Sequence, residues 1–295
     1  MKRIGFIGAG TVGTALAVRL KEKGYPVTAV ASRSPASAER LASQVDECKA
    51  LESPQAVADA TEMVFITTPD DAISTVASQV RWHRGQSVVH CSGADSLDVL
   101  EPARLLGANV GGFHPLQTFA SFTHAIENLP GSTFALEAEP PLLDTLKRLA
   151  ESLDGNWVQL GAGDKVLYHA AAVIACNYFV TLVKLATDLW KRFDVAIPEA
   201  TKALLPLLRG TINNIENVGI PDCLTGPIAR GDAGTIKMHL DALEARAPEL
   251  LRIYQELGLQ TLPVALAKGR IDDKKAKQLT DLLNSSAKAR NEAAA

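Results

Sequence analysis

Ile4-Gly5-Phe6-Ile7-Gly8-Ala9-Gly10-Thr11-Val12-Gly13 decides the fold of this 295-residue chain. An apolar run ends in a G-x-G-x-x-G pattern, and an amphipathic helical pattern begins at its end. A strand, a glycine-rich turn and a helix in this order form the phosphate-binding turn of a dinucleotide fold. Gly8 permits the tight turn, Gly10 lets the backbone approach a pyrophosphate, and Gly13 allows the helix to pack closely on the strand.

The helix that follows this turn offers free N–H groups and a partial positive charge to phosphates. We therefore expect the turn to bind a dinucleotide. The residues expected to contact it are Gly8, Ala9, Gly10, Thr11, Val12 and Gly13. The alternative is a glycine-rich turn that binds nothing, which the flanking strand and helix patterns disfavour.

The residues after the second expected strand indicate which dinucleotide is bound. A fold that binds NAD usually places an acidic residue there, to accept hydrogen bonds from the ribose hydroxyls. This chain has Ser32, Arg33 and Ser34 instead, and its first acid after the strand is Glu39. A cation and two hydroxyls suit a 2′-phosphate, so we expect NADP. The alternative is that Arg33 is an ordinary surface arginine.

Apolar runs alternate with helical patterns over residues 1–160, which predicts an α/β fold with a doubly wound, mostly parallel Rossmann sheet. The expected strands are 3–7, 27–31, 63–67, 87–90, 109–112, 133–136 and 157–160. The expected helices between them are 11–23, 36–44, 71–79 and 141–153. Residues 161–286 show helical patterns only and are expected to form an all-α domain for substrate binding and dimerisation. The Ala-rich residues 287–295 are expected to be a frayed tail.

Helix boundaries in the second half follow from capping residues. We expect Asp164 to cap a long helix over 165–193, Asp232 to cap one over 233–246, and Asp272 to cap the last one. Pro198 is expected in the first turn of another helix. The helix over 165–193 is apolar nearly all round, which predicts that it is buried on several sides.

Composition and spacing exclude several classes of function. The net charge of −3 lacks the basic excess of a nucleic-acid-binding protein. The longest apolar stretch, 170–186, is interrupted by Asn177, Thr181 and Lys184, so we expect a buried helix of a soluble protein and no membrane span. The four cysteines are far apart and form no C-x-x-C pair, which favours reduced thiols in the cytoplasm and no zinc site. No secretory signal pattern begins the chain.

In an open α/β sheet the ligand lies beyond the carboxyl ends of the strands, so polar residues there are candidates for the site. Thr67, Thr68, Pro69 and Cys91 follow two such strands and are expected beside the cofactor. Ser92 and His114 are expected nearer the nicotinamide, where they could hydrogen-bond a substrate oxygen. The alternative for His114 is a buried histidine held by backbone groups at a turn.

The long helix brings further candidates onto one face. Lys165 and His169 are four residues apart and so share a helix face. Two neighbouring cations lower each other's pKa, which makes the pair a candidate proton donor. Tyr168 flanks Lys165 and is expected to contact the substrate, and Asn177 lies about 80° round the helix from His169. The alternative for Lys165 is a solvated residue of the first helical turn.

Arg230 lies in a loop over residues 224–232 between two helices. Its guanidinium could bind a substrate carboxylate in a bidentate manner, or a cofactor phosphate. The alternative is a surface arginine in a loop shaped by Pro227 and Asp232.

With these residues in hand, nearly the whole chain resembles a family of Rossmann proteins with an all-helical C-terminal domain of unknown function. The pieces that carry the resemblance are the sequences GFHPLQTF at 112–119, KVLYHAAA at 165–172 with CNY at 176–178, and LTGPIARGD at 224–232. The family is similar to a wider group that holds 6-phosphogluconate dehydrogenase, ketopantoate reductase, pyrroline-5-carboxylate reductase and deazaflavin-dependent NADP oxidoreductase. Some of its members resemble a second type of ketopantoate reductase.

The resemblance implies roles for particular residues. Several members of the wider group carry a catalytic lysine on the first long helix after the sheet, with asparagine four residues later. Lys165 matches the lysine, and His169 stands where the asparagine would be. Prephenate dehydrogenases carry a His-Pro pair after a late strand, which His114 and Pro115 match. The resemblance also implies a homodimer formed through the helical domain.

Together these observations predict an NADPH-dependent reductase of a small ketone or imine beside a carboxylate. Ketopantoate reduction is one reaction of this kind. Lys165, with His169, would protonate the developing alkoxide. Ser92, His114 or Asn177 would hold the oxygen, and Arg230 the carboxylate. One alternative is a prephenate-type dehydrogenase, which would need more cations than Arg230 and Lys165. Another is a non-catalytic protein that senses NADP.

Overall fold

The glycine-rich turn joins strand β1 (Ile4–Ile7) to helix α1 (Thr11–Glu22), as the sequence pattern predicts. In the computed structural model, residues 1–293 are described, and the side chains of residues 1–285. The predicted frayed tail, 287–295, lies outside the residues whose side chains are described. The chain divides into two compact units, Met1–Asn177 and Tyr178–Ala295.

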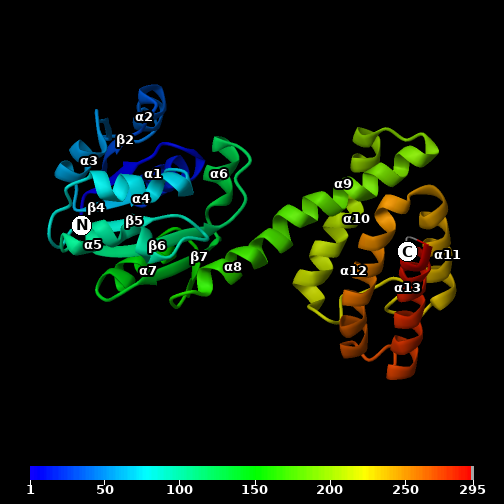
Figure 1. Cartoon of the computed structure of the whole chain (residues 1–295). Helices are drawn as coiled ribbons and strands as arrows, with labels where there is room; N and C mark the ends of the chain where they lie inside the picture. The colour runs from blue at the N-terminus through cyan, green and yellow to red at the C-terminus, as the bar shows by residue number, and fades with distance from the viewer. Residues whose placement is uncertain (294–295) are drawn as a thin grey trace. The chain divides into compact units, whose positions relative to one another are not determined.

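The first unit is built on one eight-stranded sheet of order β3-β2-β1-β4-β5-β6-β7-β8 (Figure 1). Its further strands are β2 (Val27–Ala31), β3 (Lys49–Ala50), β4 (Met63–Ile66), β5 (Ser87–His90), β6 (Asn109–Leu116), β7 (Thr133–Ala138) and β8 (Asn156–Gln159). All neighbouring strands pair in parallel except β6 and β7, which are antiparallel. The prediction of a doubly wound, mostly parallel sheet is confirmed.

Helices cover the sheet through two apolar cores. The helices are α2 (Pro35–Ala42), α3 (Pro54–Ala60), α4 (Asp70–Gln79), α5 (Glu101–Leu105), α6 (Phe122–Asn128) and α7 (Leu142–Ser152). Residues of α1, α2, α6 and α7 pack into one core, and residues of α3, α4 and α5 into the other. Helices α3, α5 and α6 and strand β3 were not predicted from the sequence; all four are short.

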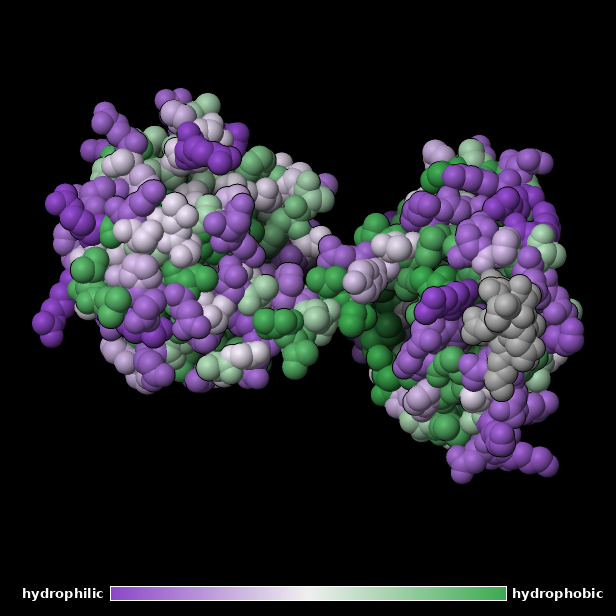
Figure 2. Space-filling view, viewed as in Figure 1, coloured by the Kyte–Doolittle hydropathy of each residue, from purple (hydrophilic) through white to green (hydrophobic). Residues whose placement is uncertain are grey.

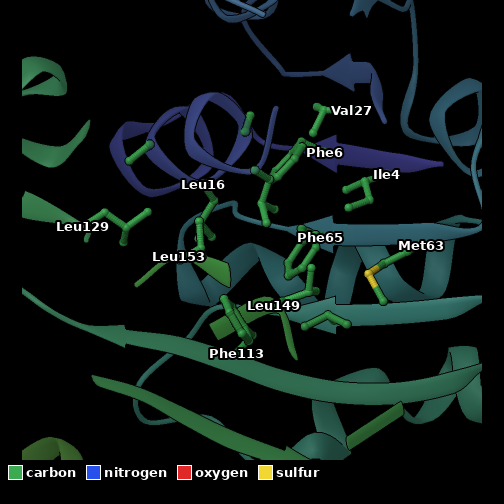
Figure 3. Packing of buried hydrophobic residues seen from close by; sticks show 14 of the residues in the cluster. Ile4, Phe6, Leu16, Val27, Met63, Phe65, Phe113, Leu129, Leu149 and Leu153 are labelled. Carbon is green, nitrogen blue, oxygen red and sulfur yellow. The ribbon is translucent and has the colours of Figure 1, made fainter. Parts of the chain in front are cut away.

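Phenylalanines from adjacent strands form the centre of the first core (Figure 3). Phe6 stacks on Phe65 with ring centroids 5.3 Å apart, and Phe113 meets Phe134 at 4.6 Å. All four rings are fully buried. Truncating one such ring to alanine typically costs about 3–5 kcal/mol, so these four rings contribute strongly to the stability of the first core.

Strand β6 is longer than the sequence suggested, which corrects the expected position of His114. The predicted strand ends at 112, but β6 continues to Leu116, so His114 and Pro115 lie within the strand. The parallel pairing with β5 ends at the pair His90↔Gly112, while the antiparallel pairing with β7 continues to Leu116↔Thr133. Because β5 no longer lies beside Pro115, the missing N–H of this proline leaves no ladder bond unmade on that side.

The helical part begins before the boundary between the compact units. Its elements are α8 (Asp164–Ala172), a π-helical turn (Val173–Asn177), α9 (Tyr178–Trp190), a short 3₁₀ turn (Lys191–Phe193), α10 (Ile197–Val218), α11 (Ala233–Arg246), α12 (Pro248–Ala267) and α13 (Asp273–Ala293). The sheet ends near the predicted boundary at residue 160, but α8 belongs to the first compact unit. The assignment of roles to the two domains stays a prediction.

The capping predictions hold in two of three cases. Asp232 accepts from the backbone N–H of Thr235 (3.0 Å), and Asp272 from that of Lys275 (2.8 Å). Asp164 is not the cap of α8: Gly163, in the left-handed region with φ +90°, holds that position. The Asp164 carboxylate instead accepts from the N–H of Gly161 (2.9 Å), because the glycine-containing turn folds back over the start of the helix.

The long apolar helix is exposed in the single chain, which overturns the prediction that it is buried on several sides. Only Lys165 and Thr187 are buried along α8 and α9. Apolar side chains gather on the surface where these two helices run (Figure 2). By length and composition alone, residues 164–193 are also long and apolar enough to cross a membrane, which is weak evidence for a single helix. The sequence showed correctly that this segment is apolar all round, but not what covers it.

Candidate active site

The glycine-rich turn has the geometry that its sequence predicts. Gly8 has φ +109°, and a Cβ there would lie 2.6 Å from the backbone of Thr67. A Cβ on Gly13 would lie 2.4 Å from Thr67 Oγ1, which donates a hydrogen bond to the Gly8 carbonyl (2.8 Å). A Cβ on Gly10 would meet nothing within 4 Å. Gly8 and Gly13 are therefore needed by the fold, whereas Gly10 leaves open space over the start of α1.

A cavity of about 690 Å³ lies over this turn. The predicted cofactor residues that line it are Gly8, Ala9, Gly10, Ser32, Arg33, Ser34, Thr67, Thr68 and Pro69. Four predicted residues do not line it: Thr11, Val12, Gly13 and Cys91. Gly13 faces Thr67, and burial raises the pKa of the Cys91 thiol to about 12, which keeps it protonated. The cavity is large enough to hold much of a dinucleotide.

Two arginines line this cavity, and only Arg33 was predicted from the sequence. Arg40 of α2 donates to the Ala9 carbonyl (Nη2 to O, 3.5 Å), and its guanidinium carbon lies 4.4 Å from the centre of the Phe122 ring. Arg33 is exposed at the same cavity. The hydroxyl of Ser34 caps α2, accepting from the N–H of Ser37 (3.4 Å). One acid, Glu52, also lines the cavity, so its charged side chains are two arginines and one carboxylate.

Beside this turn, the carboxyl ends of β4 and β5 and the middle of β6 bring a second group of polar residues together. Ile66 pairs with His90, and His90 with Gly112. This is the edge at which open α/β sheets bind ligands. Helix α8 adds Lys165, Tyr168 and His169 to the group through the contacts described below.

Lys165 is buried, with 2% of its surface exposed. Its Nζ donates to the carbonyls of Ser92 (3.1 Å) and Asp95 (2.9 Å) and lies 3.3 Å from His90 Nε2. Burial lowers the pKa of this lysine, although the carboxylate of Glu137 opposes the shift. A Cβ on Gly112 would lie 2.8 Å from Nζ, so the glycine makes room for the amine. The alternative of a solvated lysine in the first helical turn is excluded.

His90 is a site residue that the sequence analysis missed. It is fully buried, and its Nδ1 accepts from the backbone N–H of Ser92 (3.2 Å). Burial and the neighbouring Lys165 lower the pKa of His90 to about 3, so the ring is neutral at physiological pH. In the sequence it is the last residue of an apolar strand. A polar residue at the carboxyl end of a buried strand was the signal that could have revealed it.

His114, Tyr168 and His169 form a second cluster beside Lys165. His114 Nδ1 lies 2.9 Å from Tyr168 Oη, and the rings of His114 and His169 are 6.1 Å apart. A Cβ on Gly93 would lie 2.7 Å from His169 Nδ1 and 2.8 Å from His114 Nε2, so this glycine is required by the close approach of both histidines. Burial, His169 and Lys165 lower the pKa of His114 to about 4. The buried Nδ1 of His169 has no hydrogen-bond partner among the described residues.

The hydroxyl of Ser92 forms hydrogen bonds within the protein, whereas the sequence suggested a hydrogen bond to substrate. Its hydroxyl donates to Asp70 Oδ2 (2.9 Å) and accepts from the N–H groups of Ala94 (3.2 Å) and Asp95 (3.0 Å). The only hydroxyl proton is thus used within the protein. Ser92 shapes the loop after β5, and its predicted role in holding a substrate oxygen stays a prediction with no free donor to support it.

Two predicted residues make none of the contacts described above. Asn177 is exposed at the end of the π-helical turn, a feature often found at functional sites. Arg230 belongs to the second compact unit, where it is exposed and lines a cavity of about 440 Å³ with Lys268 and Arg270. Over the part of the chain that the structure describes, no three metal-ligating side chains gather.

Fold and site together define a class: a Rossmann-type oxidoreductase with a dinucleotide-binding cavity next to a buried lysine–histidine cluster. Comparison with known families agrees. Residues 1–115 match the Rossmann-like domain family, and residues 132–261 match the family described as domain of unknown function DUF2520. The chain therefore joins a Rossmann-like domain to a DUF2520 domain, as its resemblance to Rossmann proteins with a helical domain of unknown function implied.

Solved structures are similar over nearly the full chain. A Bacteroides fragilis protein assigned as an NADP oxidoreductase shares 26% identity, with a TM-score of 0.71, over 89% of this chain and 98% of its own. Protein TM1727 from Thermotoga maritima also shares 26% identity, with a TM-score of 0.64, over 96% and 99% of the two chains. A reductive aminase from Aspergillus terreus, solved with NADPH, shares the fold at 14% identity and a TM-score of 0.61, over 98% and 94%. No curated protein matches the sequence.

Proposed function

We propose that this protein is a soluble NADPH-dependent reductase that transfers hydride to a small ketone or imine next to a carboxylate. One observation carries the proposal. The cavity over the glycine-rich turn, with Arg33 and Arg40 in its wall, opens at the same strand edge that brings together Lys165, His90 and His114. A seat for a phosphorylated dinucleotide beside buried acid–base groups is what a reductase requires.

The residues of the cavity suit NADP in particular. N–H groups at the start of α1 face the open space over Gly10 and can bind the pyrophosphate. Arg33 and Arg40 can bind the 2′-phosphate by charge-assisted hydrogen bonds, which a carboxylate at the end of β2 would oppose. NADPH, when bound, supplies the hydride. The cofactor named for the similar Bacteroides and Aspergillus proteins is of the same kind.

His114 is the group best placed to hydrogen-bond the reacting oxygen or nitrogen. Tyr168 engages its Nδ1, while Nε2 has no partner in the described chain and the residue is partly exposed. A neutral imidazole can donate from this nitrogen to an oxygen as negative charge develops on it, which lowers the barrier to hydride transfer. The ring of His169 lies 6.1 Å from that of His114, and Lys165 of α8 donates to the Ser92 carbonyl in the loop after β5.

The test combines binding and turnover. Titration of the purified protein with NADPH and NADH should show tighter binding of NADPH. NADPH consumption is then screened against 2-keto acids, ketopantoate among them, and against cyclic imines. A protein that binds neither dinucleotide would exclude this function. Tight NADPH binding without consumption of any substrate would favour the alternative of an NADP-sensing protein, and oxidation of prephenate would favour a prephenate-type dehydrogenase.

We also propose that the protein is a cytoplasmic homodimer that associates through its helical part. Large apolar side chains are exposed on α8, α9 and α10, among them Leu167, Val180 and Leu207. Exposed apolar surface of this extent is typical of a protein–protein interface. The four free thiols suit a reducing compartment. Arg230 would then bind a substrate carboxylate only if the assembled protein brings it to the cavity edge.

A further inference from the structure

The amine of Lys165 has three polar neighbours at hydrogen-bond distance, and all three come from β5 and the loop that follows it. Two are carbonyl oxygens, of Ser92 (3.1 Å) and Asp95 (2.9 Å), and the third is His90 Nε2 (3.3 Å). Carbonyl oxygens only accept hydrogen bonds. Two N–H groups of the amine therefore donate to these carbonyls. Whether the amine donates to His90 Nε2 or accepts from it depends on whether Nε2 carries a proton.

The other nitrogen of His90 decides this. His90 Nδ1 accepts from the backbone N–H of Ser92 (3.2 Å), so Nδ1 carries no proton. A neutral imidazole carries one N–H, and the hydrogen bond made by one nitrogen sets the state of the other. The ring is fully buried and uncharged. His90 therefore carries its proton on Nε2, which faces Lys165.

Only one state of the lysine satisfies all three contacts. A neutral amine has two N–H groups for the two carbonyls and a lone pair that accepts from His90 Nε2–H. In an ammonium, the third N–H would point at the N–H of His90 Nε2, and neither donor would have an acceptor. The ammonium would also be a buried charge.

We propose that His90 is a positioning residue that holds Lys165 as a neutral amine, and that the pair fastens the loop of residues 92–95 to α8 beneath the site. The role of this pair in turnover rests on the proposed reductase function. Lys165 keeps no N–H and no lone pair for a substrate. The group that hydrogen-bonds the substrate is then His114, above the pair, and Lys165 acts on the reaction through the loop and through its lack of charge.

The surroundings of Lys165 agree with an uncharged amine. The titratable groups that face it are His90 and Cys91 at the end of β5, Asp95 in the loop, Asp70 of α4, His114 of β6 and Glu137 of β7. Burial lowers the pKa of Lys165 and raises that of Glu137, so burial disfavours the charged form of each group. Within the described part of the chain, one buried oxygen of Glu137 has no hydrogen-bond partner, as expected of a carboxyl group that forms no ion pair with the lysine.

Nuclear magnetic resonance of the full chain labelled with ¹⁵N and ¹³C in lysine and histidine tests the proposal directly. The Lys165 signals are assigned by their loss in Lys165→Arg, and those of His90 by their loss in His90→Asn. At pH 7 we expect the nitrogen shift of a neutral amine at Lys165 and a proton on Nε2 of His90. An ammonium at Lys165, or a proton on Nδ1 of His90, would overturn the proposal.

His90→Asn also provides a graded readout. The Asn oxygen can stand in for Nδ1 as acceptor from Ser92, but nothing replaces Nε2–H. Because the amine loses its donor, we expect the pKa of Lys165 to rise by about one unit. His83→Asn changes an exposed histidine paired with Asp59 (3.0 Å) and should leave the Lys165 signals unchanged. An unchanged Lys165 pKa in folded His90→Asn would count against the proposal. If this variant does not fold, the wild-type spectra still decide.

These measurements need neither cofactor nor substrate, so they separate the two proposals. A neutral Lys165 in a protein that does not bind NADPH would support the proposed lysine–histidine pair and refute the reductase function. A charged Lys165 in an active reductase would do the reverse. In an active enzyme, His90→Asn should also move the acid limb of the pH profile to higher pH, because Lys165 becomes protonated at a higher pH; loss of packing alone would not do this.

Discussion

Tyr168 Oη lies 2.9 Å from His114 Nδ1 and thereby joins helix α8 to strand β6. The two rings meet edge to face, with centroids 5.6 Å apart. Burial raises the pKa of Tyr168 to about 12 and lowers that of His114 to about 4, so both groups are uncharged at neutral pH. The tyrosine hydroxyl can donate to Nδ1, which would leave a proton on His114 Nε2, the nitrogen that has no partner among the residues that the structure describes.

Replacing Tyr168 with phenylalanine should therefore reduce turnover while leaving NADPH binding intact. Without the hydroxyl, the tautomer of His114 is no longer set. We expect kcat to fall about 10- to 100-fold, and His114→Ala to lower it by about 100-fold or more, because the donor itself is removed. Tyr254→Phe is a matched control, since Tyr254 makes the same contact with His239 (2.8 Å) within the second unit. Equal losses in Tyr168→Phe and Tyr254→Phe would refute a specific role for Tyr168.

The choice of NADP over NAD should depend on Arg33 and Arg40. A charge-assisted hydrogen bond to phosphate contributes about 1.5–3 kcal/mol, so removing either arginine should weaken NADPH binding by about 10- to 100-fold. Binding of NADH, which lacks the 2′-phosphate, should change little. The exposed Arg148 of α7 does not line the cavity, and Arg148→Ala serves as the control. Equal weakening of NADPH and NADH would show that the arginines do not contact the 2′-phosphate.

The sequence predicted what local patterns determine and missed what distant segments determine. The glycine-rich turn, the central strands and the caps at Asp232 and Asp272 are set by neighbouring residues, and they were found. Arg40 was missed because its partner Phe122 lies 82 residues away (122 − 40), on another helix. The extension of β6 through His114 depends on pairing with β7, which no local pattern reveals. Lys165 was found, but its burial comes from carbonyls some 70 residues earlier.

The glycines of the turn should differ in what their replacement costs. A methyl group at Gly13 would lie 2.4 Å from Thr67 Oγ1, so Gly13→Ala should destabilise the first unit by about 1–3 kcal/mol. A methyl group at Gly10 would meet no atom of the described residues within 4 Å, so Gly10→Ala should keep the wild-type melting temperature. It should nevertheless weaken NADPH binding, because the methyl group occupies the space that the pyrophosphate needs. Thermal unfolding and NADPH titration of both variants would check this; a Gly10→Ala protein that binds NADPH normally would place the phosphates elsewhere.

The two neutral histidines should make the fold sensitive to mild acid. The pKa of His90 is about 3 and that of His114 about 4 in the folded protein, below the ordinary value of 6.5. Between pH 6.5 and 4 the unfolded chain therefore binds more protons than the folded one, and the free energy of unfolding falls as the pH falls. The expected loss is of the order of 1 kcal/mol per pH unit for each histidine. His90→Asn should reduce this slope when melting temperatures are compared at pH 7.5, 6 and 5, and an undiminished slope would mean that His90 is charged in the fold.

The exposed apolar helices should be covered by a second copy of the chain. Leu207 of α10 is 65% exposed, and Leu105 of α5, in the first unit, is 78% exposed. If the helical part forms the dimer, Leu207→Glu places a carboxylate in an apolar contact, where burying an unpaired charge is costly, and sedimentation should show the mass falling from about twice 31.4 kDa towards 31.4 kDa. Leu105→Glu is the same change on a helix outside that part and should leave the dimer intact. A monomeric wild-type protein would contradict the proposed dimer, and dissociation of both variants alike would place the contact elsewhere. Arg230 belongs to the helical unit. If Leu207→Glu is a monomer that still binds NADPH but has lost NADPH-dependent turnover, assembly is needed to complete the substrate side of the site.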